Sequence, residues 1–294
     1  MALPVVNVPT LRQSILDDLF KDFGNSRKWI RNLLEPLAWI SAHRFAEIAA
    51  RFDETVANSG FHEAMRQIVS HLVSELYQYG SELVPRDGPL LVVSNHPGAY
   101  DSLAIAASLP RDDLKIIATG FPLLRRLPHA CQHLIFTDSQ TGSGFFVARA
   151  AIRHLRSGGS LLMFPSGRVE PDPAVLPGAV EAVRAWSPSV GLLLSKVPQT
   201  KVLITIVSDV LAPIFLHNPL IKLWRGIRDP QAVAETLQII TQMLFSQWVR
   251  SKPRISFNLP KTIDELRQSN STLYHAIITE ARRLLLEHIQ GNCS

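Results

Sequence analysis

The sequence predicts an α/β fold, in which a mixed, mainly parallel β-sheet is flanked by helices and preceded by an N-terminal helical segment. From residue 89 onward, short apolar runs of strand length alternate with amphipathic stretches of helical length, as in strand–helix–strand units. Residues 10–80 instead show helical periodicity. We therefore divide the chain into an N-terminal helical segment, residues 1–84, and an α/β domain, residues 85–294.

The N-terminal segment contains a basic stretch with an apolar stripe. Between Ser26 and Arg51, five basic residues stand against two acidic ones, a net charge of +3, and the stretch includes Trp29 and Trp39. This combination is typical of a helix that lies on an anionic membrane. The same stripe would also serve to pack the helix on the α/β domain, and both interpretations can hold together. The stripe begins with Ile30, Leu33, Leu34 and Leu37.

The remaining elements follow from periodicity and from turn residues. A second N-terminal helix is expected from Phe61 to Leu76, with Gly80 at its end. Thr262 and Glu265 form a capping box that predicts the start of one long C-terminal helix through Leu284. The predicted strands are 89–94, 114–118, 133–137, 160–164, 201–207 and 254–259. The predicted helices of the α/β domain are 101–109, 121–128, 143–157, 178–196 (broken near Pro188) and 230–250.

Composition narrows the class of protein. Apolar residues make up 46% of the 294 residues, enough for a sizeable core, and 30 basic against 25 acidic residues give a net charge of +5. This mild excess favours anionic partners such as phosphates or acidic lipids, and it is too scattered to predict a nucleic-acid partner. Two distant cysteines and a start without signal-peptide features indicate a reducing, cytoplasmic setting. The most apolar window, 202–221, contains Asp209 and Pro213, so we interpret it as a strand, a loop and a short helix.

The most informative stretch follows the first strand of the α/β domain. Leu90–Val93 is an apolar run, Pro97 and Gly98 force a turn, and Asp101 can start a helix. His96 therefore lies at the carboxyl edge of the sheet, where α/β folds usually bind ligands. On a continuous helix, side chains five residues apart point about 140° away from each other. His96 and Asp101 can meet only if the turn between them bends the chain.

If they meet, the pair has a defined chemistry. A carboxylate bonded to one imidazole nitrogen fixes the tautomer and leaves the other nitrogen basic, so that it can take a proton from an alcohol. The same spacing also occurs where a loop histidine stands near an aspartate that caps a helix.

The sequence around this pair resembles a known family. Asn95-His-Pro-Gly-Ala-Tyr-Asp101 after an apolar strand resembles the NHxxxxD motif of the glycerolipid acyltransferases, the family of the lysophosphatidic acid and glycerol-3-phosphate acyltransferases. About 60 residues later, Leu161–Arg168 resembles the second family signature, a strand that runs into FPEGTR. The resemblance covers roughly residues 85–210. It implies that His96 is the general base on an acceptor hydroxyl and that Asp101 orients His96.

The resemblance also implies the substrates. The acyl donor would be acyl-CoA or acyl-carrier protein, used as a co-substrate, and no cofactor or metal is expected. The acceptor would be a lipid of phospholipid biosynthesis, and the enzyme would be peripheral on the cytoplasmic face of a membrane. The short cluster His129–His133 lacks the second group of ligands that a metal site needs.

The acceptor loop, residues 165–170, departs from the family pattern. The family assigns it to the glycerol phosphate, and a glycine with an arginine suits an anion. Here Ser166 replaces the usual glutamate and Val169 the usual arginine, with Arg168 one position earlier, and the arginine of a third family block is missing from 133–140. A non-phosphorylated alcohol acceptor, another lipid acceptor, or a non-catalytic lipid-binding relative therefore stay open. The candidate substrate-binding residues are Asn95, Gly98, Ser166, Gly167, Arg168 and Glu170.

Overall fold

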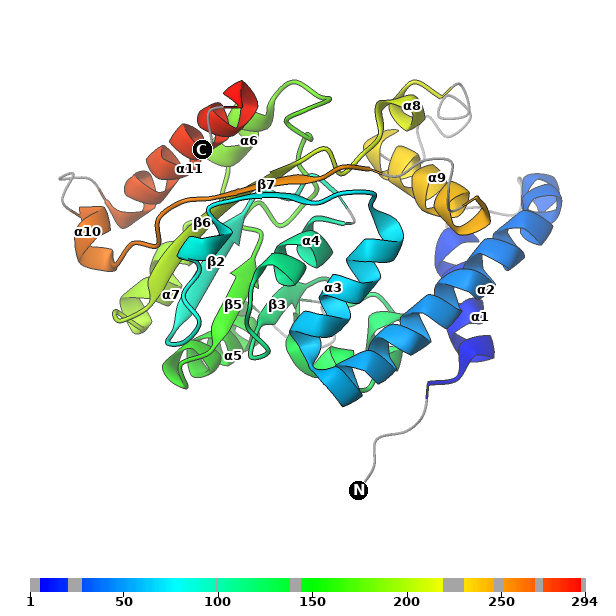
Figure 1. Cartoon of the computed structure of the whole chain (residues 1–294), viewed down its shortest axis with the longest axis horizontal. Helices are drawn as coiled ribbons and strands as arrows, with labels where there is room; N and C mark the ends of the chain where they lie inside the picture. Colours follow the sequence, from blue (N-terminus) through cyan, green and yellow to red (C-terminus); the bar gives the residue numbers. More distant parts are fainter. Residues whose placement is uncertain are drawn as a thin grey trace.

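The computed structural model describes residues 6–20, 28–98, 100–137, 144–218, 230–245, 251–267 and 272–291. They form a seven-stranded sheet in the order β1-β7-β6-β2-β5-β3-β4 (Figure 1). The five strands from β6 to β4 are mutually parallel, whereas β7 is antiparallel to β6 and parallel to β1. The predicted mixed, mainly parallel sheet is confirmed. The strands are β1 (Tyr77–Tyr79), β2 (Leu90–Ser94), β3 (Lys115–Ala118), β4 (Leu134–Phe136), β5 (Ser160–Met163), β6 (Lys201–Ser208) and β7 (Arg254–Phe257).

Helices cover both faces of this sheet, because its central strands bury side chains on both sides. In β2, Leu90 and Val92 point into one core, whereas Leu91 and Val93 point into the other. Helices α2, α3 and α4 contribute to the first core, and α5, α6, α7, α10 and α11 to the second. Such two-sided burial explains why the first four residues of β2, Leu90–Val93, are all apolar. The N-terminal and central helices are α1 (Val8–Phe20), α2 (Lys28–Ser59), α3 (Phe61–Leu72), α4 (Asp101–Ser108), α5 (Gly144–Arg156), α6 (Ala179–Arg184) and α7 (Ser189–Lys196). The C-terminal helices are α8 (Pro213–Leu216), α9 (Pro230–Leu244), α10 (Ile263–Arg267) and α11 (Leu273–Gln290).

The end of the N-terminal helical segment was predicted wrongly. Helix α3 stops at Leu72, and the chain then extends into β1, where the sequence predicted helix as far as Gly80. Leu76 fits the helical period of the preceding residues, but pairing with β7 at the sheet edge decides the conformation. The boundary at residue 84 between the two proposed units stays a prediction.

Two further elements differ from expectation. Instead of a helix over 121–128, the structure has a single 3₁₀ turn, Leu124–Arg126, between Pro122 and Pro128. The capping box is present, since Thr262 N donates to Glu265 Oε2 at 2.7 Å, but it opens only the short α10. Helix α11 has its own N-cap, Thr272. The end of the helix predicted over 230–250 lies outside the described residues from 246 onward.

Helix α2 exposes apolar side chains in the part of the basic stretch that the structure describes. Trp39 is 43% exposed, and Leu37 and Ile40 beside it are also exposed, whereas Ala38 and Ala42 are buried. The side chain of Trp29 lies outside the described residues. Among the helices that the structure describes, none is both long enough and apolar enough to span a bilayer.

Candidate active site

The turn between β2 and α4 brings His96 and Asp101 together. His96 Nδ1 lies 2.7 Å from Asp101 Oδ2, and the Gly98 backbone N–H donates to the same carboxylate oxygen at 3.1 Å. The Asp101 side chain is fully buried, whereas that of His96 is 27% exposed. The bend at Pro97 and Gly98 that the sequence required is therefore present. Since Nδ1 faces a carboxylate, it carries the ring proton of the neutral histidine, and Nε2 is left as the base.

The surrounding charges favour a basic His96. Burial, the largest single influence, lowers the pKa of this imidazole, whereas the Asp101 carboxylate raises it through its charge and its hydrogen bond. Glu235 and Glu170 add to the increase, and the net pKa of His96 lies above its ordinary value. A base with a pKa near the working pH combines a neutral form with strong proton affinity.

The imidazole ring is also held sterically. It stacks on Phe164 with ring centroids 4.4 Å apart, and Phe164 comes directly after β5. No side chain or backbone group of the described residues bonds to His96 Nε2. Since the His96 side chain is partly exposed, its Nε2 is available to accept a proton from a bound hydroxyl.

The second loop is joined to the first through its backbone. The Glu170 N–H donates to the His96 carbonyl at 2.7 Å. Between Phe164 and Glu170 the chain makes a tight turn, in which Gly167 has a φ of +64° that favours glycine. Ser166 Oγ closes the turn by donating to the Arg168 carbonyl at 2.8 Å. The two sequence motifs therefore meet in space.

The side chains of this loop separate into an inner and an outer group. Glu170 is only 2% exposed, and its Oε1 accepts a hydrogen bond from Trp186 Nε1 at 2.9 Å. Burial raises the pKa of the Glu170 carboxyl above its ordinary value. Arg168 is exposed, and its guanidinium makes no ion pair or hydrogen bond with the described residues. The cation is thus on the rim and the carboxyl beneath it.

Two predicted substrate-binding residues are occupied by protein contacts. The Asn95 amide donates to the Val207 carbonyl at 2.9 Å and accepts from the Val207 N–H at 2.8 Å, which links the end of β2 to β6. The Gly98 N–H is bonded to Asp101. Binding of a substrate by either residue would require these bonds to be exchanged, and both roles stay predictions.

Sequence reasoning missed the contribution of α9. Gln231 Nε2 donates to the carbonyls of Pro97 and Glu170, one from each motif loop. Gln242 accepts a hydrogen bond from the Tyr100 hydroxyl, and Glu235 is close enough to His96 to affect its pKa. The available signal was a row of polar residues at helical spacing in an otherwise apolar helix.

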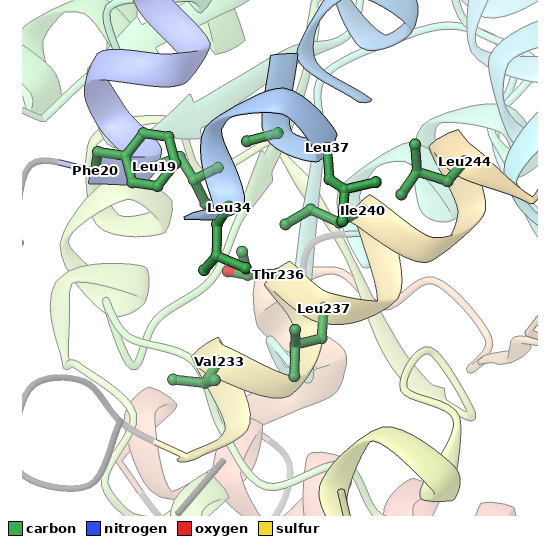
Figure 2. A pocket seen from close by; sticks show the side chains of 10 residues that line it. Leu19, Phe20, Leu34, Leu37, Val233, Thr236, Leu237, Ile240 and Leu244 are labelled. Atoms are coloured by element: carbon green, nitrogen blue, oxygen red, sulfur yellow. The ribbon is translucent and has the colours of Figure 1, made fainter. Parts of the chain in front are cut away.

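An apolar cavity of about 190 Å³ lies on another face of α9, against α1 and α2 (Figure 2). None of the predicted site residues lines it. It is lined by Leu19, Phe20, Leu34, Leu37, Ala38, Val233, Thr236, Leu237, Ile240 and Leu244.

The fold and the site together define an α/β protein with a histidine–aspartate pair at the carboxyl edge of its sheet. In sequence, residues 75–207, a range that contains both motif loops, match the family described as Acyltransferase. The chain is also similar in structure to the crystal structure of the 1-acyl-sn-glycerophosphate (LPA) acyltransferase PlsC from Thermotoga maritima. That similarity has a TM-score of 0.48, with 17% sequence identity over 95% of each chain. No curated protein sequence matches the chain significantly.

The match over residues 75–207 agrees with the resemblance that the two motifs indicated. An acyltransferase implies an acyl donor and an acceptor as substrates.

Proposed function

We propose that the protein transfers a fatty acyl group from acyl-CoA or acyl-carrier protein to a hydroxyl of a glycerolipid acceptor of the lysophosphatidate or glycerol 3-phosphate type. The observation that carries the proposal is the 2.7 Å contact of Nδ1 of the partly exposed His96 with the buried Asp101, which leaves His96 Nε2 as the base. The match of residues 75–207 to the acyltransferase family supports the reaction type.

In the proposed mechanism, His96 Nε2 takes the proton of the acceptor hydroxyl while the oxygen of that hydroxyl attacks the thioester carbonyl. Asp101 stabilises the imidazolium that forms. The tetrahedral oxyanion collapses, the carbon–sulfur bond breaks, and the thiolate takes the proton from Nε2. The products are an ester and a free thiol, and the neutral His96 is restored without an acyl-enzyme. A thiolate is a good leaving group, so one base suffices.

The acceptor is proposed to bind at the second loop. Arg168 is exposed on the rim near the dyad, so its guanidinium can pair with a phosphate. A neutral alcohol is the second candidate acceptor, because Ser166 stands where the family has glutamate and the buried Glu170 adds no positive charge.

A location at the membrane surface is supported by the carboxyl edge of the sheet. The parallel strands end there, and the loops and first helical turns that follow β3, β4, β5 and β6 expose apolar side chains beside the His96 loop. The exposed charged side chains in the described parts of these loops and turns are basic, with the exception of Glu181 in the first turn of α6. Such a surface suits anionic lipid. The apolar residues are Phe121, Phe145, Phe146, Val169 and Ile214, and the basic ones are Arg125, Arg126, Arg149 and Arg168.

The test is acceptor-dependent release of free thiol from labelled acyl-CoA, or from acyl-carrier protein, over a panel of phosphorylated and neutral acceptors. The wild type should form a labelled ester with at least one acceptor, and His96→Ala should lose about 10²- to 10⁴-fold in rate. Near-normal transfer by a folded His96→Ala variant would refute the mechanism. Lipid binding without thiol release would instead identify a non-catalytic lipid-binding protein.

A further inference from the structure

Helix α9 has a row of polar side chains on one side, and members of this row contact the two motif loops, although the helix lies outside residues 75–207. Gln231, Glu235, Gln238 and Gln242 are spaced by four, three and four residues, which places them on one side of the helix. The three glutamines are buried. Apolar residues of the same helix line the cavity against α1 and α2 (Figure 2). A buried polar row in an amphipathic helix requires partners, and those of Gln231 and Gln242 include groups of the candidate site.

Gln231 bonds to both motif loops at once. Its Nε2 donates to the Pro97 carbonyl at 2.7 Å and to the Glu170 carbonyl at 3.1 Å, and the residue is 8% exposed. Between the same two loops, the Glu170 N–H donates to the His96 carbonyl. One amide group therefore bridges the residue after the proposed base and the last residue of the acceptor loop.

Pro97 explains why a side chain is needed at this point. Two adjacent backbone segments normally exchange N–H···O=C bonds in both directions, but proline has no N–H to donate. In the described residues, no backbone N–H donates to the carbonyls of Pro97 or Glu170. A buried carbonyl without a donor is costly. The two hydrogens of the Gln231 amide supply one donor to each carbonyl.

We propose that Gln231 is a positioning residue, which fixes the His96–Pro97 turn on the acceptor loop and so holds His96 Nε2 at reaction distance from an acceptor bound there. The inference rests on the proposed function. Glu235, one helical turn later, limits the same turn from a second direction, since a Cβ at Gly98 would lie 3.0 Å from Glu235 Oε1. Loss of the bridge frees the two loops to separate, and a misplacement of about 1 Å costs up to about 10²-fold in rate.

The first experiment compares Gln231→Met with a matched control, Gln238→Met. Methionine has a similar length and no donor. Gln238 is also buried in α9 and also bonds backbone, the Val210 carbonyl at 2.9 Å and the Ala212 N–H at 2.8 Å, but it contacts neither motif loop. For Gln231→Met we expect kcat to fall by about 10- to 100-fold while both KM values stay within about threefold. For Gln238→Met we expect Tm to fall about as much as in Gln231→Met, while kcat stays within about threefold of wild type.

The second experiment needs no activity. NMR titration of the His96 ring in the ligand-free protein should show its pKa falling toward the ordinary value in Gln231→Met, because the contact with Asp101 loosens, and not in Gln238→Met. If Gln231→Met does not fold, Gln231→Ala, which admits water to the two carbonyls, takes its place in both measurements. An unchanged kcat together with an unchanged His96 titration overturns the positioning role. If the His96 pKa differs between wild type and Gln231→Met but the wild type transfers no acyl group, the proposed function is overturned and the positioning role is supported.

Discussion

Replacing Asp101 by asparagine separates the charge of this side chain from its hydrogen bonds. Asp101 Oδ2 accepts from His96 Nδ1 at 2.7 Å and from the Gly98 N–H at 3.1 Å, and an amide oxygen can accept both. The fold should survive, whereas the negative charge beside the imidazolium is lost. A hydrogen bond to a charged group contributes about 1.5–3 kcal/mol and a neutral one about 0.5–1.5 kcal/mol. The difference, about 1–1.5 kcal/mol, corresponds to about one pKa unit.

The sign of the pH effect follows from the role of His96 as a base. Only neutral imidazole takes a proton, so activity should fall as the pH drops through the His96 pKa, which lies above the ordinary 6.5. In Asp101→Asn this acid limb should move down by about one pH unit. The plateau of kcat should also fall, by about 10²- to 10⁴-fold, because the tautomer is no longer fixed.

The measurement is kcat/KM as a function of pH, from about pH 5 to about pH 9, where histidine titrates. Asp113→Asn is the matched control: it removes a carboxylate charge that pairs with Arg111 at 2.6 Å and lies before β3, at the opposite edge of the sheet. Its acid limb should stay in place. An acid limb that coincides in Asp101→Asn and wild type would show that Asp101 does not set the basicity of the catalytic group.

Three further outcomes are expected. Arg168→Ala should raise the KM of a phosphorylated acceptor about 10- to 150-fold, with partial rescue by Arg168→Lys; acceptor kinetics that do not change would favour a neutral alcohol. Asp172→Ala should lower the free energy of unfolding by at least about 3 kcal/mol, because the Asp172 carboxylate accepts from the backbone N–H groups of residue 174 and residues 209–211. Asp172→Asn should lower it less, and equal losses in thermal unfolding would contradict this account. Vesicle binding should rise with the content of anionic lipid and weaken with salt, since charges are screened over about 10 Å at 0.1 M. Equal binding to neutral and anionic vesicles at all salt concentrations would refute an electrostatic contribution of residues 26–51.

The parts of the site that the sequence predicted correctly are local. The apolar run of β2, the Pro97–Gly98 turn and the start of α4 lie within 19 residues of chain, from Leu90 to Ser108, and each has its own signal. His96 and Asp101 are five residues apart, so only one bend decides whether they meet. The register of the parallel strands then places the loop after β5 beside the loop after β2, because β2 and β5 are neighbours.

What the sequence did not predict depends on contacts between distant residues. Gln231 lies 134 residues from Pro97 and 61 from Glu170, and β1 becomes a strand only because β7 is available beside it. The contacts of Asn95 also depend on a distant part of the chain. As a motif residue it was expected to face a substrate, but the β2–β6 pairing ends at Ser94 and Thr205, and the Asn95 amide continues it to Val207.

Pro97 has two opposite effects on the first motif loop. Pro97 provides the bend that lets His96 meet Asp101, and it thereby removes the N–H that would have tied the turn to its neighbour. The structure restores that tie from Gln231, at the second position of α9, where the chain returns to the carboxyl edge after β6. The residues matched by the family end at 207, so the match includes the bend and excludes the group that compensates for it. A variant of the dyad and a variant of α9 are therefore expected to affect the same quantity, the position of His96, through different parts of the chain.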